Sequence, residues 1–115
     1  MKKPSHVDIE FDRETFDTIV RVFTKMIENR EDIDFSRYDL APFEEFIALM
    51  EKLKSFQGAK SSVVTIPMTR DDWSVYKPYV KHANDIDLEY EESELMGDLS
   101  LKYTMWHADG TIRVD

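Results

Sequence analysis

The sequence contains no cysteine and only three glycines among its 115 residues. Without cysteine there are no disulfide bonds, no thiolate nucleophiles and no cysteine-ligated zinc or iron–sulfur sites. So few glycines do not supply a phosphate-binding loop, and the common nucleotide-binding, hydrolase, zinc-protease and calcium-loop motifs are all missing. We therefore expect no enzymatic activity, no cofactor and no metal, although carboxylates that converge only in space would escape such a search.

Long apolar runs are also missing. No segment approaches the length of a signal-peptide core or of a membrane-spanning helix. We therefore expect a cytoplasmic protein that makes no contact with a membrane.

Positive charge is the third deficit. Aspartate and glutamate outnumber lysine and arginine by 24 to 15, which gives a net charge of −9 and a pI near 4.8. This balance opposes direct binding to nucleic acid, because the phosphate backbone requires an excess of cations. It favours a partner protein with a basic surface, while solubility alone is the simpler explanation of an acidic surface.

The residues that are present are sufficient for one core. Hydrophobic residues make up 42% of the chain, and neither repeats nor a glycine-rich or proline-rich linker divide it. We expect a single α+β domain over residues 1–115, with three helices packed on one face of a mainly antiparallel sheet and a C-terminal β-meander.

The first two thirds of the chain predict alternating strands and helices. Alternation predicts a strand over 6–12, and helical spacing predicts a helix that Asp12 caps and that runs to about Asn29. The segment 30–40 reads as a loop, and a second helix is expected from Pro42 to near Gly58. A strand over 61–67 and a third helix follow, the latter capped by Thr69 with Asp72 and kinked or broken at Pro78.

The last third predicts three more strands. Residues 85–91 and 99–107 alternate between polar and apolar, and Asp109-Gly110 is a hairpin signal that leads into a strand over 111–114. This register places Trp106 directly across from Arg113. The pair is interpreted either as a cross-strand cation–π contact or as an exposed anchor for a partner.

One face of the expected 85–91 strand is acidic. Its carboxylates would repeat at intervals of about 7 Å along one side of the sheet, and such a row is not buried unpaired. It is solvated, neutralised by Lys102 and Arg113, bound to a cation, or covered by a basic partner. The predicted partner-binding residues are Asp85, Asp87, Glu89, Glu91, Trp106 and Arg113.

A second row of ligand-type side chains lies on the first strand. His6, Asp8, Glu10 and Asp12 share one face, but their spacing along one strand is too open for a single ion. We therefore predict no metal site there unless neighbouring strands contribute ligands.

Three functions are compatible with these features. The first is a non-enzymatic interaction protein that covers a basic surface of another protein, physically analogous to a toxin-neutralising immunity protein or an antitoxin. The second is a nucleic-acid mimic, because carboxylates near 7 Å match the spacing of phosphates along one strand. The third is a homo-oligomeric structural protein, for which cations around the third helix (Arg70, Lys77, Lys81) would meet the acidic strand of another copy.

Overall fold

The chain folds into an α+β domain, described in a computed structural model over residues 6–36, 40–58, 61–105 and 112–114. These residues form four α-helices and three strands, joined in places by single 3-10 turns. The order along the chain is β1 (His6–Asp12), α1 (Arg13–Glu28), η1 (Arg30–Asp32), α2 (Phe43–Lys54), β2 (Val63–Thr69), α3 (Arg70–Lys81), η2 (Ala83–Asp85), α4 (Tyr90–Met105) and β3 (Ile112–Val114). No helix within these ranges is both long enough and apolar enough to span a membrane.

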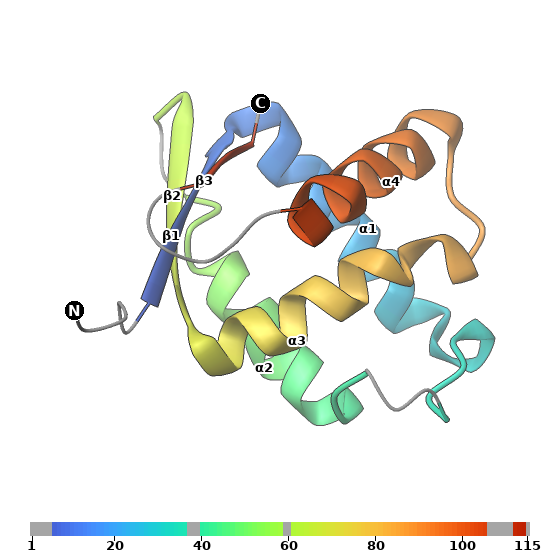
Figure 1. Ribbon diagram of the computed structural model, residues 1–115. Coiled ribbons are helices and arrows are strands. Elements are labelled where there is room, and N and C mark those ends of the chain that lie inside the picture. The colour runs from blue at the N-terminus through green and yellow to red at the C-terminus, as the bar shows by residue number, and fades with distance from the viewer. Residues whose placement is uncertain (1–5, 37–39, 59–60, 106–111, 115) are drawn as a thin grey trace.

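The sheet has β1 at its centre. β1 pairs with β2 in antiparallel orientation over its whole length. β3 pairs with the other edge of β1 in parallel orientation, so the strand order is β2-β1-β3. All four helices lie on the same side of this sheet (Figure 1). Ile9 and Phe11 of β1 and Val64, Ile66 and Met68 of β2 are buried against the helices, as the period-2 alternation of each strand requires.

The core between the sheet and the helices is rich in aromatic rings. Phe46 of α2 stacks on Tyr79 of α3 with 3.9 Å between ring centroids, and Phe23 of α1 meets both Phe46 and Tyr76 edge to face. The buried hydroxyl groups of Tyr76 and Tyr103 lie 2.7 Å apart and hydrogen-bond to each other, joining α3 to α4. Burial removes these rings from water, while the hydroxyl group of each of these two tyrosines finds its partner inside the core.

Both predicted side-chain helix caps in the first two thirds are confirmed. The Asp12 carboxylate accepts from the Thr15 amide at the start of α1. At the start of α3, Thr69 and Asp72 form a full capping box. Of the kink or break expected at Pro78, the break is wrong, because α3 continues to Lys81. The proline removes one internal hydrogen bond, and the helix continues for three more residues.

The predicted meander is wrong in its first two strands. Residues 83–85 form the 3-10 turn η2, residues 86–89 connect it to α4 without a strand, and residues 99–105 belong to α4. The alternation around 86 is real but local, since Ile86 is buried and Asp87 exposed in an extended connection that has no ladder partner within the described chain. The fourth helix was therefore missed, and the row of carboxylates on a strand does not exist.

The remainder of the predicted meander is only partly described. A strand does form at 112–114, but it pairs in parallel with β1, and the Cα of Arg113 lies opposite that of Glu10. The antiparallel partner expected for it, 99–107, is helical up to Met105. Trp106 and the Asp109-Gly110 hairpin lie outside the described residues, so the predicted Trp106–Arg113 pair stays a prediction. The strand register from which the pair was inferred does not exist, because residues 99–105 are helical.

Candidate functional site

Helix α4 presents two opposite stripes at helical spacing. Its inward side carries four buried residues separated by four, three and four positions, which are Glu92, Met96, Leu99 and Tyr103. Its opposite side carries exposed residues at the same spacing, which are Tyr90, Glu94, Gly97 and Leu101. We call this exposed stripe, together with Glu91 and Asp98 beside it, the outer face of α4.

Two large apolar side chains stand in water on this face. Tyr90 is 79% exposed and Leu101 is 63% exposed, the two highest values among the exposed large hydrophobic residues of the described chain. A single exposed apolar residue is ordinary, and here two of them lie eleven positions apart on one stripe of one helix.

The chain around this face is acidic without local compensation. Between Lys81 and Lys102 there is no lysine or arginine, and there are seven acidic residues, namely Asp85, Asp87, Glu89, Glu91, Glu92, Glu94 and Asp98. The carboxylates of Glu91, Glu94 and Asp98 are exposed, and none of them forms a hydrogen bond or ion pair with another described residue. This surface is therefore strongly negative and solvated.

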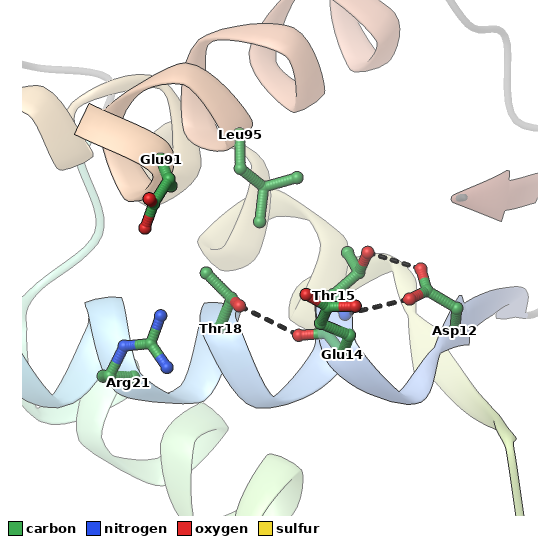
Figure 2. Close-up of a pocket in the computed structure, with 7 residues that line it drawn as sticks. All are labelled: Asp12, Glu14, Thr15, Thr18, Arg21, Glu91 and Leu95. Carbon is green, nitrogen blue, oxygen red and sulfur yellow. Dashed lines mark hydrogen bonds between the residues drawn. The ribbon is translucent and has the colours of Figure 1, made fainter. Parts of the chain in front are cut away.

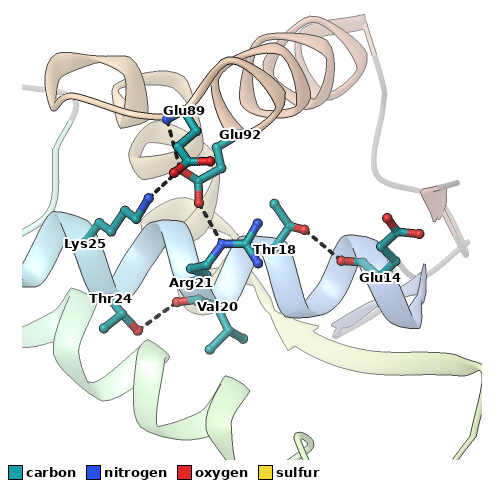
Figure 3. Close-up of polar contacts among 8 residues, drawn as sticks. All are labelled: Glu14, Thr18, Val20, Arg21, Thr24, Lys25, Glu89 and Glu92. Carbon is teal, nitrogen blue, oxygen red and sulfur yellow. Dashed lines mark hydrogen bonds and ion pairs between the residues drawn. The ribbon is translucent and has the colours of Figure 1, made fainter.

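Glu92 is the exception, because its side chain points inward from the same helix. Only 1% of the residue is exposed. Its carboxylate accepts from Arg21 Nε at 2.7 Å, from Lys25 Nζ at 2.6 Å and from the Glu89 amide at 3.0 Å (Figure 3). Two cations of α1 and one backbone donor from the connection before α4 thus surround a single buried carboxylate.

These contacts decide the protonation state of Glu92. Burial by itself raises the pKa of a carboxyl group, but the hydrogen bonds from Arg21, Lys25 and the Glu89 amide, with the charge of Lys25, outweigh it and lower the pKa of Glu92 to about 2. The carboxylate is therefore ionised at neutral pH. The pairs join α4 to α1 and fix which side of α4 faces outward.

A cleft of about 490 Å³ runs between α1 and α4. Figure 2 shows Glu91 and Leu95 of α4 on one side and Glu14, Thr18 and Arg21 of α1 on the other. The lining is completed by Asp12 and Thr15, which are occupied with each other because the Thr15 hydroxyl and amide both donate to the Asp12 carboxylate. The carboxylates of Glu14 and Glu91 thus face one opening from opposite helices, with the apolar Leu95 between them.

A smaller cleft of about 220 Å³ lies between α2 and α3. Two of its charged groups are paired with each other, because Lys52 contacts Asp72, which also closes the capping box of α3. Burial raises the pKa of Asp72, but the bonds from Lys52 and Thr69 prevail and the pKa is lowered. The one cation among the described residues that line this cleft is therefore already bound by a carboxylate of the protein.

The predicted partner-binding residues separate in the structure. Asp85 is half-buried at the end of η2, Asp87 and Glu89 are exposed in the connection to α4, and Glu91 lies in the first turn of α4 at the cleft. They follow one another around a connection and a helix start, so the shared strand face proposed for them is wrong even though three of the four are exposed. Arg113 belongs to β3, and Trp106 is not described.

Sequence reasoning missed most of the outer face. Tyr90 falls on the apolar side of the strand predicted over 85–91, and Leu101 on the apolar side of the strand predicted over 99–107, yet both are exposed. The signal was the 4-3-4 spacing of Glu92, Met96, Leu99 and Tyr103, which a window longer than the two alternating segments would have revealed.

The ligand-type residues predicted on β1 are spread along the strand and do not gather at one point. Asp8 and Glu10 lie on the partly exposed side of the strand, away from the helices, and Asp12 caps α1. Among the described residues, no group of three or more histidine, aspartate or glutamate side chains is close enough to hold a metal ion.

No known protein family, curated protein or solved structure matches this chain.

Proposed function

We propose that this protein is a non-catalytic binding module that docks against a basic surface of another protein through the outer face of α4 and the adjoining α1–α4 cleft. The observation that carries the proposal is the set of exposed carboxylates Glu91, Glu94 and Asp98, which have no partner among the described residues, beside the exposed Tyr90 and Leu101. The proposal places the protein in the physical class of inhibitors such as immunity proteins and antitoxins, in a cytoplasmic setting that the lack of cysteine permits.

The arrangement of these carboxylates is unfavourable for the isolated protein. Glu91 and Glu94 are three residues apart, and Glu94 and Asp98 are four apart, so each pair shares one side of the helix. Like charges at this spacing cost about 0.2–0.5 kcal/mol per pair. A cationic partner removes this repulsion, whereas the stability of the free protein gains nothing from it.

The cleft extends the negative surface onto a second helix. Glu14 of α1 faces the same opening as Glu91, and Leu95 offers an apolar contact between them. A lysine or arginine side chain that enters the cleft therefore meets carboxylates from two sides while its methylene groups lie on leucine. Charge of this kind raises the association rate and selects the partner more than it adds affinity.

The alternative of a nucleic-acid mimic loses its motivation. It was based on a strand of carboxylates at phosphate spacing over 85–91, and that segment contains no strand. The exposed carboxylates of α4 follow helical spacing and are interrupted by tyrosine, glycine and leucine, a mixture that suits a protein surface better than a phosphate backbone.

Charge reversal at matched positions tests the proposal. The triple variant Glu91→Lys, Glu94→Lys, Asp98→Lys changes the outer face, and the triple variant Glu44→Lys, Glu45→Lys, Glu51→Lys makes the same change in net charge on exposed positions of α2. Binding of a fluorescent twelve-residue oligolysine peptide is measured by anisotropy at low and moderate salt. We expect the α4 variant to weaken binding by about tenfold or more, the α2 variant by less than about threefold, and binding by the unaltered protein to weaken steeply with salt.

Equal losses in the two variants would show that only the net charge matters, and would contradict a docking surface on α4. Circular dichroism of both variants provides the folding control, since all six positions are on helix surfaces.

A further inference from the structure

Gly97 is in the middle of α4, and nothing among the described residues requires a glycine there. Glycine lowers helix stability relative to alanine, because it gives up the most backbone freedom on folding. No described glycine has a positive φ angle, so the backbone at Gly97 suits any residue. A Cβ atom built on Gly97 meets nothing within 4 Å in the part of the chain that the structure describes, so no element described there requires the space that the missing side chain leaves.

The residues around Gly97 indicate how a binding partner could use the space that the missing side chain leaves. It lies between Tyr90 and Leu101 on the exposed stripe, with Glu94 one turn before it and Leu101 one turn after it. Tyr90 and Leu101 are separated by eleven positions, which is three turns and about 16 Å along the axis. The stripe thus has an apolar side chain at each end. At Gly97, between them, no side chain projects from the helix, and the carboxylates of Glu94 and Asp98 lie beside this position.

This shape fits a helix better than it fits an extended segment. Where two helices cross, a residue without a side chain at the crossing point allows the axes to come closer, and flanking side chains then pack along the partner. Tyr90 and Leu101 are placed to contact an apolar stripe on both sides of such a crossing. Glu91, Glu94 and Asp98 are placed to pair with cations that border the stripe.

We propose that the outer face of α4 receives an amphipathic, lysine- or arginine-bordered helix of the partner protein, which crosses α4 at Gly97. The inference rests on the proposed function and names the element of the partner that this surface binds. Recognition of an amphipathic helix through its apolar face is a recurrent mode among protein complexes.

The charges favour a different protein over a second copy of this chain. Two copies that met through α4 would oppose Glu94 and Asp98 with the same residues at a net charge of −9 on each molecule. A head-to-tail contact with α3 is little better, because its exposed cations Arg70 and Lys81 stand at opposite ends of a helix of 12 residues. A foreign basic helix meets neither difficulty.

Two synthetic peptides of identical composition provide the test. One is an 18-residue sequence of leucine and lysine arranged at helical spacing, and the other contains the same residues in an order without an apolar stripe. Both are titrated by fluorescence anisotropy into the protein, into Gly97→Gln and into Gly58→Gln. Gly58 is the matched control, because it is exposed and a Cβ built there also meets nothing within 4 Å.

We expect the amphipathic peptide to bind at least about tenfold more tightly than the rearranged peptide. Gly97→Gln is expected to remove most of that advantage while it changes binding of the rearranged peptide by less than about twofold. Gly58→Gln is expected to change neither. A second variant, Tyr90→Ser with Leu101→Ser, is expected to act like Gly97→Gln, and light scattering of the free protein is expected to show a monomer.

The outcomes separate the two proposals. If both peptides bind equally and Gly97→Gln has no effect, while charge reversal on α4 still abolishes binding, the helix inference is overturned and acidic docking stands. If neither peptide binds, or if charge reversal on α4 has no more effect than that on α2, both proposals fail. A dimer that Gly97→Gln dissociates would replace the foreign helix by a second copy.

Discussion

Helices α1 and α4 have the same length and opposite character. Each has 16 residues, and they are joined through Glu92. α1 packs against β1, β2, α2 and α4 and buries seven residues, among them Phe16, Phe23 and Met26. α4 covers it from outside, leaves Tyr90 and Leu101 in water and contains a glycine. The comparison teaches that α1 is constrained by the core, whereas half of α4 is not explained by the fold and is available to a partner.

The largest expected effect contrasts one apolar residue from each helix. Phe23→Ala on α1 removes a fully buried ring that contacts Phe46 and Tyr76, and should lower the free energy of unfolding by about 3–5 kcal/mol. Leu101→Ala on α4 should change it by less than about 0.5 kcal/mol, because the side chain is mostly exposed. Urea denaturation monitored by circular dichroism measures both. A loss above about 2 kcal/mol for Leu101→Ala would mean that this leucine is covered within the protein.

The next effect concerns the connection between the two helices. Glu92→Ala leaves Arg21 and Lys25 without their common partner and the Glu89 amide without an acceptor. We expect a loss of about 2–3 kcal/mol, at or below the lower end for buried pairs because both cations are partly exposed. Glu94→Ala, two positions away on the exposed side, should have almost no effect on urea denaturation. Equal effects of the two substitutions would contradict the assignment of Glu92 as the connection.

Acid should reproduce part of this loss. The pKa of Glu92 is about 2 in the folded protein, against an ordinary value of 4.5 in the unfolded chain. A lowered pKa contributes stability that is fully present above about pH 5 and is lost as the pH falls from there toward 2. The difference is at most about 3 kcal/mol, and exposure of Arg21 reduces it. Thermal denaturation at pH 7, 5, 4 and 3 should therefore show a smaller acid-induced decrease for Glu92→Gln than for the unaltered protein, and parallel decreases would refute this role.

The smallest effect has the opposite sign. Gly97→Ala should raise the free energy of unfolding by about 0.5–1 kcal/mol, since the site is an exposed helix interior with open space for a Cβ atom. The melting temperature, measured by calorimetry, should rise by a few degrees. A destabilised variant would show that α4 needs the glycine for its own packing, and the inference of a crossing helix would lose its basis.

The same two helices show what the sequence could and could not predict. α1 was predicted with its cap at Asp12, because a capping residue, a helical apolar stripe and a preceding strand agree there. α4 was missed because Asp85 to Glu91 and Leu99 to Tyr103 each alternate over a short stretch, and alternation is the stronger local signal. The segment forms a helix that buries Met96, Leu99 and Tyr103 on one side. The spacing of these residues is recognisable only when a longer stretch of the sequence is compared with the helical period.

The candidate site was predicted in its charge but not in its geometry. The sequence places the acidic residues near 85–98 and shows that they lack neighbouring cations. It does not reveal that Arg21 and Lys25, 71 and 67 residues away, neutralise Glu92 alone and leave Glu91, Glu94 and Asp98 to solvent. Contacts at such separation depend on how two helices pack, so no local pattern reports them.

The most direct measurement is a residue-by-residue map of where a cation-rich peptide binds. Amide chemical shifts of the isotope-labelled protein are followed by NMR during titration with the amphipathic leucine–lysine peptide. Binding through the outer face of α4 predicts that the largest shifts fall between residues 87 and 102 and at Glu14 and Thr18 across the cleft. Shifts that spread evenly over the acidic residues of all elements, or that gather on α2, would contradict it.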